Sequence, residues 1–385
     1  MAELYDLIVI GSGGGSILAD SAAESGHKAA MIEAKGWGGT CLNRGCIPTK
    51  IMVHAADLIR ESERSRKIAV RGEPLTIDWP ALKKRVFSKI AEGESMPDYY
   101  APYSNIRLYK ALAVLAGKEK ILGKERFAVD LKDSSRPDGA VQERIYADRL
   151  LLANGGRTHI PQGAGFEESG FLSSEILFSE SGWPDELPES MIIIGGGDIG
   201  AEFAHIFSAF GVRVKLVQHN KRLVPNEISA RLRQLLEKNG VEIYLNCDTL
   251  SSGRKNGRKY LKIRERETSE LQLLEAEEFF IAPGIVPNSD SLKTESLGIA
   301  CDAKGWIKTN EFLETNVENV YALGDINGRA QLRHKANYEA SVLAYNLFGP
   351  GSEAADKRRK VSYDFVPAGT FSAMHQFLLR PVLLR

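Results

Sequence analysis

The sequence has few cysteines, no excess of charge and no long apolar run. Each of these absences excludes some classes of protein or kinds of partner. Four cysteines in 385 residues do not make a secreted disulfide framework, so a close pair is better explained as redox-active or metal-binding. Lysine plus arginine equals aspartate plus glutamate at 50 each, which gives no electrostatic reason to expect nucleic acid or an anionic membrane as a partner. No segment has the pattern of a signal peptide or the length of a membrane span. We therefore expect a cytoplasmic protein with neither nucleic acid nor membrane as a partner.

Length and glycine content favour several domains of the α/β class. A chain of 385 residues should form two or three domains. Its 36 glycines suit a fold with many tight turns.

A nucleotide-binding pattern opens the chain. An apolar strand over Leu7–Ile10 is followed by the glycine-rich turn GSGGGS, a helical pattern, a second strand over Lys28–Ile32 and the acid Glu33. This order of strand, turn, helix, strand and acid, with the acid roughly 20 residues after the glycines, is typical of a dinucleotide-binding unit.

Each position of this pattern has a physical reason. Gly11 permits the tight turn, Gly13 lets the backbone approach a pyrophosphate, and the helix N-terminus attracts its charge. Glu33 would accept hydrogen bonds from an adenosine ribose. Ser16 replaces the third glycine, and we expect its small side chain to allow close packing of helix and strand.

A second pattern of this kind lies in the middle of the chain. The strand Met191–Ile194 runs into GGGDIG, Gly195–Gly200, which fits the whole six-residue fingerprint. We predict that the following helix packs its apolar face on a sheet. That face comprises Ile199, Phe203, Ile206, Phe207 and Phe210.

The residue after the next strand bears on the choice of nicotinamide cofactor. Where an acid would select NADH, the chain has Gln218, followed by His219, Lys221 and Arg222. Without a carboxylate to hold a free 2′-hydroxyl, and with cations nearby, the sequence favours NADPH over NADH. The alternative is that the three basic residues form only a solvated turn.

Two of the four cysteines stand close together in GGTCLNRGCIPTK. Cys41 and Cys46 would be separated by about 7.5 Å of rise on a regular helix, whereas a disulfide needs Cα atoms roughly 4.4–6.8 Å apart. Gly45 and Pro48 perturb helix geometry, so a pairing requires a specially shaped helix start. A metal site is disfavoured because no further cysteine or histidine ligand stands nearby.

The remaining pattern supplies the other elements of the chain. Helices are predicted over Ile51–Ser65 and Trp79–Glu92, and strands over Ile106–Leu115, Arg126–Leu131 and Arg149–Ala153.

With these residues in place, the sequence resembles the class I pyridine nucleotide–disulfide oxidoreductases, and most closely their dihydrolipoamide dehydrogenase and mycothione reductase branch. The matching segments run in the family's order from Leu7 to Val366. They are GSGGGS, GGTCLNRGCIPTK, GGGDIGAEFA, APGIVPN, ALGD and LRHKANYEA.

The resemblance assigns catalytic roles to four residues. Cys41 matches the interchange thiol that attacks a substrate disulfide, and Cys46 matches the charge-transfer thiol that lies against the flavin. Lys50 matches the lysine near the flavin's reactive nitrogen, and Glu202 the carboxylate that pairs with it. No metal is implied.

The resemblance also implies two cofactors, FAD and either NADPH or NADH. Asp325 would bind the ribityl or phosphate region, and the helix opened by His334 would face the flavin's pyrimidine edge with its N-terminus. The implied FAD residues are Gly11, Gly13, Gly14, Gly15, Ser16, Glu33, Gly39, Thr40, Lys50, Ala113, Gly155, Gly324, Asp325, His334 and Ala336. The implied NAD(P) residues are Gly195, Gly197, Asp198, Ile199, Gly200, Glu202, Gln218, His219 and Gly284.

The implied activity moves two electrons between NAD(P)H, FAD and a Cys41–Cys46 disulfide, with a lipoyl or small-molecule disulfide as substrate. Dihydrolipoamide dehydrogenase activity is favoured, in which the net flow runs from dithiol to NAD. The alternative within the class is reduction of mycothione or another small disulfide. Mercuric reductase is disfavoured because no extra cysteine pair stands at the C-terminus, and the thioredoxin reductase type because the cysteines follow the first nucleotide turn.

The implied architecture is two Rossmann-like domains, with the nicotinamide domain inserted in the flavin domain. We expect a first FAD segment over 1–150, an NAD(P) domain over 151–280, a second FAD segment over 281–348 and part of an interface domain over 349–385. That interface domain forms the family's homodimer and supplies a His–Glu pair, and His375 lacks the sequence context for this role.

Three departures and the C-terminal stretch qualify the expected activity. Asp198 stands where relatives often have an aromatic or aliphatic residue over the nicotinamide pocket, Ile285 replaces an arginine, and Asn154 replaces a threonine. A chain lacking most of the interface domain is expected to bind flavin but to turn over disulfides weakly. The alternative of another class is a flavin-binding remnant with diaphorase activity or none.

Overall fold

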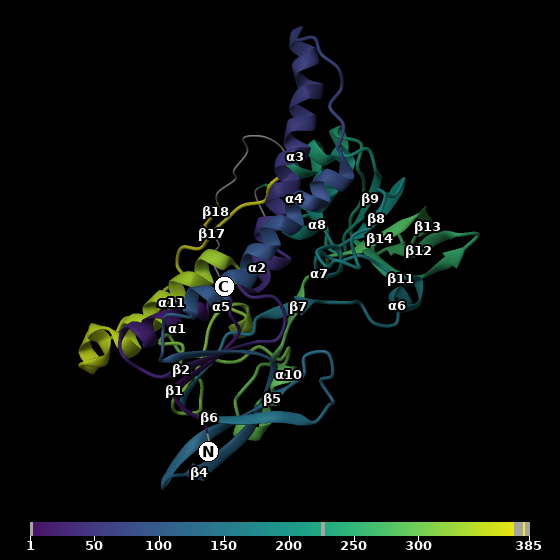
Figure 1. Ribbon diagram of the computed structural model, residues 1–385. Helices are drawn as coiled ribbons and strands as arrows, with labels where there is room; N and C mark the ends of the chain where they lie inside the picture. The colour runs from purple at the N-terminus through teal and green to yellow at the C-terminus, as the bar shows by residue number, and fades with distance from the viewer. Residues whose placement is uncertain (1–2, 225–227, 373–379, 382–385) are drawn as a thin grey trace.

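The computed structural model describes residues 3–224, 228–372 and 380–381, and its arrangement is shown in Figure 1. A seven-stranded sheet in the order β3-β2-β1-β6-β5-β4, with β16 beside β6, forms its first part. Its strands are β1 Glu3–Ile10, β2 Ala29–Glu33, β3 Ile106–Lys110, β4 Leu112–Ile121, β5 Lys124–Lys132, β6 Val141–Leu152 and β16 Val320–Ala322.

Strand β1 lies in the middle of this sheet and fixes its register. Leu7 pairs in parallel with Ala29 of β2 on one side and with Arg149 of β6 on the other. Alternate side chains enter different cores, as the pleat requires. Leu7 packs in one core with α1 (Ser16–Glu24) and α11 (Arg333–Phe348), and Ile8 packs in the other.

A second, four-stranded parallel sheet has the order β10-β9-β8-β14. Its strands are β8 Ser190–Ile194, β9 Arg213–Val217, β10 Glu242–Tyr244 and β14 Glu278–Ile281. An antiparallel sheet of β11 Cys247–Lys255, β12 Arg258–Glu265 and β13 Leu271–Ala276 packs beside it. The chain enters and leaves this part through a two-stranded ribbon, β7 Gly156–Thr158 and β15 Ile285–Pro287.

The longer helices join the two parts. In Figure 1, α3 (Cys46–Ser65) and α4 (Trp79–Ala91) run past α8 (Asp198–Ala209). Side chains of all three helices share one hydrophobic core with β8 and β9, including Met52, Val86 and Phe207. The other helices are α2 Gly39–Asn43, α5 Met96–Tyr100, α6 Phe166–Ser169, α7 Ser174–Leu177, α9 Ser229–Lys238 and α10 Ser289–Leu292.

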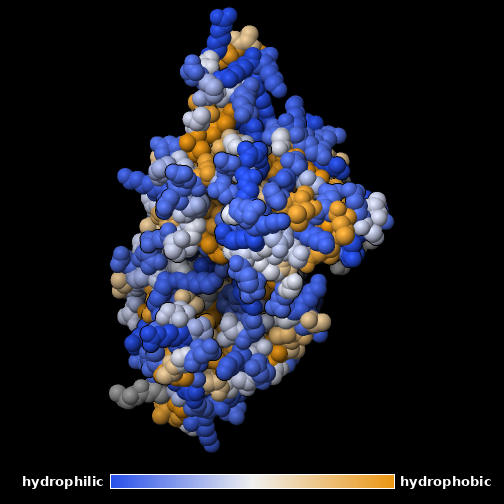
Figure 2. All heavy atoms as spheres, turned by 90° about the vertical axis from the view of Figure 1, so that its right-hand side faces the viewer, coloured by the Kyte–Doolittle hydropathy of each residue, from blue (hydrophilic) through white to orange (hydrophobic). Residues whose placement is uncertain are grey.

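The face shown in Figure 2 is mostly hydrophilic, with scattered apolar patches. Leu271 and Leu273 of β13 are among the exposed large apolar side chains. Of the helices in the described ranges, none is long and apolar enough to cross a membrane.

The predicted α/β class and strand–turn–helix units are confirmed, and several elements differ in detail. Helix α3 begins at Cys46 instead of Ile51, and β6 begins at Val141 instead of Arg149. The strand predicted over Ile106–Leu115 is divided into β3 and β4. Ile199, predicted on the buried face of α8, is exposed, because it lies in the first turn of α8 while the core contacts begin at Ala201 and Phe203.

Candidate active site

The cysteine pair lies at a break between two helices. Helix α2 ends at Asn43 and α3 begins at Cys46, and between them Gly45 has φ −135° and ψ −116°, outside the helical region. A Cβ on Gly45 would lie 3.0 Å from the carbonyl oxygen of Thr40, so a larger residue would press on α2. The break brings the free thiols of Cys41 and Cys46 within hydrogen-bonding reach of each other.

The two thiols have unequal acidities. The hydrogen bond with Cys46 is the largest cause that lowers the pKa of Cys41, and the positive charges of Arg333 and Lys50 lower it further against the effect of burial. The same hydrogen bond raises the pKa of Cys46, whose side chain is exposed. Cys41 is therefore the more nucleophilic sulfur when the pair is reduced.

An ion pair joins the cysteine helix to the second nucleotide turn. Lys50 of α3 donates to Oε2 of Glu202 on α8 over 2.6 Å. Glu202 is buried and its other oxygen accepts from the backbone N–H of Phe371 at 3.1 Å. Burial raises the pKa of Glu202, and the charge of Lys50 opposes this rise.

The first glycine-rich turn approaches the strand that precedes it very closely. Gly11 has φ +103°, and a Cβ on Gly15 would overlap the carbonyl oxygen of Gly11 and lie 2.7 Å from Val9 Cγ1. Close packing of α1 on β1 thus requires that Gly15 has no side chain. Ser16 instead donates its hydroxyl to the carbonyl oxygen of Gly13 at 3.0 Å.

The acid Glu33 is buried and holds the turn in place. Its Oε2 accepts from the N–H and the hydroxyl of Ser12 at 3.0 and 2.7 Å, and its Oε1 accepts from the N–H of Lys35 at 2.8 Å. Ser12 also accepts from the N–H of Gly38 at 3.0 Å, which connects the turn to the segment that carries the cysteines.

The structure brings several other predicted flavin residues together in pairs. A Cβ on Gly39 would lie 2.7 Å from the Cα of Gly13, and one on Gly324 would lie 3.3 Å from the Cβ of Ala336. Others lie on separate elements of the first part. Thr40 is in α2, Ala113 is buried in β4, Gly155 follows β6 with φ +65°, and His334 is exposed at the start of α11.

Asp325 and a buried acid behind it shape the end of the first sheet. Burial raises the pKa of Asp325 to about 6. Glu339 of α11 is fully buried and accepts from the N–H of Gly324 at 2.7 Å and from the hydroxyl of Tyr363 at 2.6 Å. Glu339 was missed in the sequence, although an acid on the apolar side of a helix was a signal for it.

Arg333 was also missed. It is the first residue of α11, and a Cβ on Gly13 would lie 3.9 Å from its Nη1. Because its charge lowers the pKa of Cys41, it contributes to both the first turn and the thiol pair.

The second glycine-rich turn is also closely packed at one glycine, and it has free space beside another. Gly195 has φ +108°, and a Cβ on Gly200 would overlap its carbonyl oxygen. A Cβ on Gly197 would meet nothing within 4 Å, which leaves room for a pyrophosphate at the N-terminus of α8. Gly284 has φ +136° and lies just before β15.

The residues that bear on the nicotinamide cofactor already have partners. Gln218 accepts from the N–H of Gly196 at 3.1 Å and donates to the carbonyl oxygen of Arg222 at 3.0 Å. His219 lies 3.2 Å from Asp248, and Lys221 pairs with Glu267. Two of the three basic residues therefore already contact acids.

Residues Thr370 and Phe371 join the site although no motif indicated them. The hydroxyl of Thr370 donates to Oδ1 of Asp198, and the ring of Phe371 lies 4.2 Å from Lys50 Nζ. His375, whose family role the sequence did not support, lies outside the described residues.

The other cysteines and histidines are placed away from these contacts. Cys247 is buried and burial raises its pKa, whereas Cys301 is only partly buried. His205 is fully buried against Asp57 at 2.9 Å, and His54 is exposed. In the described part of the chain, no group of three or more histidine, cysteine or acidic side chains could hold a metal ion.

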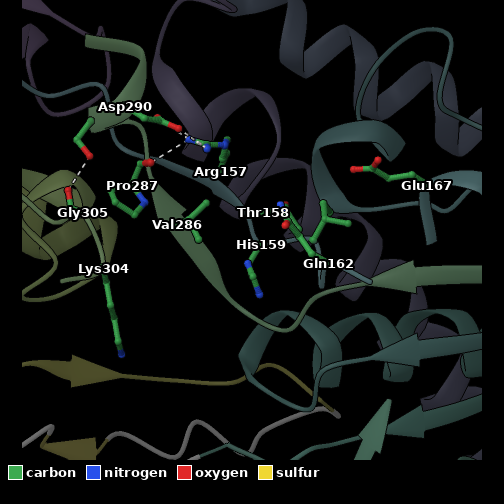
Figure 3. Close-up of a pocket in the computed structure, with 12 residues that line it drawn as sticks. Arg157, Thr158, His159, Gln162, Glu167, Val286, Pro287, Asp290, Lys304 and Gly305 are labelled. Carbon is green, nitrogen blue, oxygen red and sulfur yellow. Dashed lines mark hydrogen bonds and ion pairs between the residues drawn. The ribbon is translucent and has the colours of Figure 1, made fainter. Parts of the chain in front are cut away.

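A separate cavity of about 430 Å³ lies along the ribbon of β7 and β15 (Figure 3). Its polar walls include Arg157, which is held by Asp290 at 2.7 Å, and Figure 3 shows His159 and Lys304 extending to the same side. None of the twelve residues that line it is a predicted site residue.

Two glycine-cradled helix N-termini beside a pair of unequal thiols define a dinucleotide-dependent dithiol–disulfide oxidoreductase. Both turns have the close backbone approach of a dinucleotide-binding turn. Residues 5–340 match the family model described as pyridine nucleotide-disulphide oxidoreductase. The chain belongs to this family of FAD-dependent enzymes.

Individual relatives cover most of the chain at modest identity. Dihydrolipoyl dehydrogenase of Mycobacterium tuberculosis is 30% identical over 350 residues, which span 90% of this chain and 71% of the relative. Mercuric reductase of Staphylococcus aureus is 29% identical over 377 residues, 96% of this chain and 63% of the relative. The Cu(II) complex of the HOCl-induced flavoprotein disulfide reductase RclA from Escherichia coli has a TM-score of 0.75 at 25% identity, covering 95% of this chain and 75% of that chain.

Proposed function

We propose that this chain catalyses electron transfer between NAD(P)H and a disulfide through Cys41 and Cys46, with dihydrolipoamide and its disulfide as the favoured substrate pair. The observation that carries the proposal is the contact of two unequal thiols at the α2–α3 break, on the helix that Lys50 ties to Glu202. Bound flavin supplies the two-electron link between pyridine nucleotide and thiols.

The protein's own residues then perform the sulfur chemistry. The Cys41 thiolate attacks one sulfur of the substrate disulfide and forms a mixed disulfide, while the departing sulfur takes up a proton. Cys46 loses its proton and attacks the sulfur of Cys41. The Cys41–Cys46 disulfide forms and the second substrate thiol is released. The reverse sequence oxidises a dithiol.

We propose that the parts of the chain built on the two sheets bind different cofactors. Residues 1–150 and 281–348 would hold FAD, residues 151–280 would hold NAD(P), and residues 349–385 would belong to an interface segment. The proposed FAD and NAD(P) residues are those of the two glycine turns and their partners.

The proposed location is the cytoplasm, because a chain with only four cysteines and a close redox pair suits a reducing compartment.

A second candidate is NADPH-driven reduction of a small disulfide such as mycothione. The side chain at the end of β9, Gln218, carries no charge to oppose a 2′-phosphate, which favours this direction. Arg222 lies nearby and could contact such a phosphate. His219 and Lys221 already contact acidic side chains, so they would interact with the phosphate and with these acids at the same time.

A substrate panel tests the proposal. The flavin-loaded chain is assayed with dihydrolipoamide plus NAD, dihydrolipoamide plus NADP, and NADPH or NADH with mycothione or lipoamide, with Cys41→Ser as the matched control. We expect thiol-dependent turnover that Cys41→Ser abolishes. Equal activity of the two proteins with every substrate would contradict the proposal.

A further inference from the structure

The segment Gly369–Ser372, here called the strap, contacts both members of the Lys50–Glu202 pair. The backbone N–H of Phe371 donates to Glu202 at 3.1 Å, so both oxygens of this carboxylate are engaged, one by the strap and one by Lys50. The ring of Phe371 lies 4.2 Å from the Lys50 ammonium, within the range of a cation–π contact.

One residue earlier, the strap is tied to the second glycine turn. The hydroxyl of Thr370 donates to the carboxylate of Asp198, which is the first residue of α8 and follows Gly197 directly. Thr370 and Ser372 are only 6% and 8% exposed, and Phe371 packs against the core shared by α3, α4 and α8. The strap is thus seated on the turn.

Asp198 lies at the helix N-terminus where a dinucleotide phosphate would bind, so its hydrogen bond with Thr370 bears on dinucleotide binding. A carboxylate in the first turn of a helix is stabilised by the same positive end that would attract a pyrophosphate. Asp198 and a dinucleotide phosphate therefore compete for one region of positive potential, and they repel each other. The Thr370 hydroxyl stabilises the carboxylate where it stands, because hydrogen bonds to charged groups are the stronger ones.

We propose that the strap is a closing element of the nicotinamide site, held by the Asp198–Thr370 hydrogen bond and released when a pyridine dinucleotide binds. This rests on the proposed function. In the closed form the strap covers Lys50 and Glu202 with Phe371. Binding of the dinucleotide separates Asp198 from Thr370 and breaks the hydrogen bond from the Phe371 amide to Glu202.

The amide of Phe371 provides a direct readout, because it is hydrogen-bonded in the closed form. Hydrogen exchange is measured by mass spectrometry on peptides that cover the strap, in the flavin-loaded full chain, with and without NADP⁺ or NAD⁺. These oxidised dinucleotides bind without turnover. We expect saturating dinucleotide to accelerate exchange in the strap at least fivefold. Slower exchange on binding would overturn the proposal, since it would make the strap a fixed wall of the site.

Two variants of Thr370 separate the hydrogen bond from the shape of the side chain. Thr370→Val keeps the volume and removes the donor, whereas Thr370→Ser keeps the donor. We expect T370V to bind the dinucleotide at least fivefold more tightly than wild type and to show rapid strap exchange without ligand, with T370S close to wild type. Unchanged or weaker binding by T370V would contradict the proposal.

The two proposals can fail separately. Dinucleotide binding by the wild-type chain with no difference in T370V leaves the proposed function standing and removes the strap's role. If neither protein binds either dinucleotide while both retain flavin, the proposed function fails and the strap proposal falls with it. Binding by T370V alone would support closure by the strap.

Discussion

Lys50 Nζ lies 2.6 Å from Glu202 Oε2, and this ion pair connects the helix that begins at Cys46 with the helix that begins at Asp198. Glu202 has only 8% of its side chain exposed, while Lys50 has 35%. The pair therefore lies between the thiol side and the nucleotide side of the site. Glu202 depends on Lys50, because burying a carboxylate without a cation beside it costs free energy.

Removing the charge of Glu202 should impair electron transfer more than flavin binding. In Glu202→Gln, Lys50 loses a hydrogen bond to a charged partner, worth about 1.5–3 kcal/mol. We expect the rate of flavin reduction by NAD(P)H to fall about 10- to 100-fold in stopped-flow experiments. Glu63→Gln, which removes an ion pair of α3 with Arg60, is the control and should change the rate less than twofold. A similar loss in both variants would refute a specific role for Glu202.

The reactivity of Cys41 should depend on pH in a defined direction. Its pKa is lowered to about 6, so in the reduced protein the thiolate is present above this pH and is lost as pH falls through it. We expect the rate of alkylation of Cys41 by iodoacetamide to rise with a midpoint near pH 6. In Cys46→Ala the main stabilising hydrogen bond is absent and the midpoint should move upward. A midpoint unaffected by Cys46→Ala would show that the thiols do not interact.

Substituting the two glycines of the second turn should have different effects, one on stability and the other on NAD(P)⁺ binding. Gly200→Ala places a methyl group on the carbonyl oxygen of Gly195 and should lower the apparent melting temperature, consistent with an overpacking cost of about 1–3 kcal/mol. Gly197→Ala meets no atom within 4 Å and should leave the melting temperature unchanged while weakening NAD(P)⁺ binding. The reverse assignment of the two effects in thermal scans and titrations would contradict the geometry.

Cofactor preference should respond to the charge at the end of β9. Gln218→Glu keeps an acceptor for the N–H of Gly196 and introduces a carboxylate that would repel a 2′-phosphate and bind a ribose hydroxyl. We expect the ratio of dissociation constants for NADP⁺ and NAD⁺ to rise about tenfold. Gln234→Glu on the exposed side of α9 makes the same chemical change and should leave the ratio alone. An unchanged ratio in both would place the selection elsewhere.

Asp325 should make the stability of the flavin-free chain depend on pH. Burial raises its folded pKa from 3.8 to about 6, so the folded chain binds the proton more tightly than the unfolded chain. The stability supplied by this proton is fully present below about pH 4 and is lost as pH rises through about 6. Asp325→Asn should therefore melt at a higher temperature than wild type at pH 8 and close to it at pH 4.5. Equal differences at both pH values would point to another cause.

The local patterns were predictable because their physics is local. The turn after β1, the turn after β8 and the helix break required by the spacing of Cys41 and Cys46 depend on neighbouring residues, and glycine permits each of them. The requirement for glycine at Gly15 was not predictable, because the fingerprint gives spacing alone, whereas the contact at Gly15 depends on how α1 sits on β1.

Contacts between distant segments could not be predicted in this way. Thr370 and Asp198 are 172 residues apart in the chain, and the acids that balance His219 and Lys221 come from other strands and turns. Ile199 fitted the helical period, yet its burial depended on where the core begins along α8. Such features follow from tertiary packing, and the periodicity of a sequence gives no information about it.

Anaerobic titration of the flavin-loaded chain with NADPH shows whether electrons pass through Cys41 and Cys46. If Cys41 and Cys46 are the redox pair, the first two electrons produce two new thiols and a long-wavelength absorption band that disappears in Cys46→Ser. If the first two electrons bleach the flavin and no thiols are formed, the Cys41–Cys46 pair is not in the electron path and the proposed mechanism is contradicted.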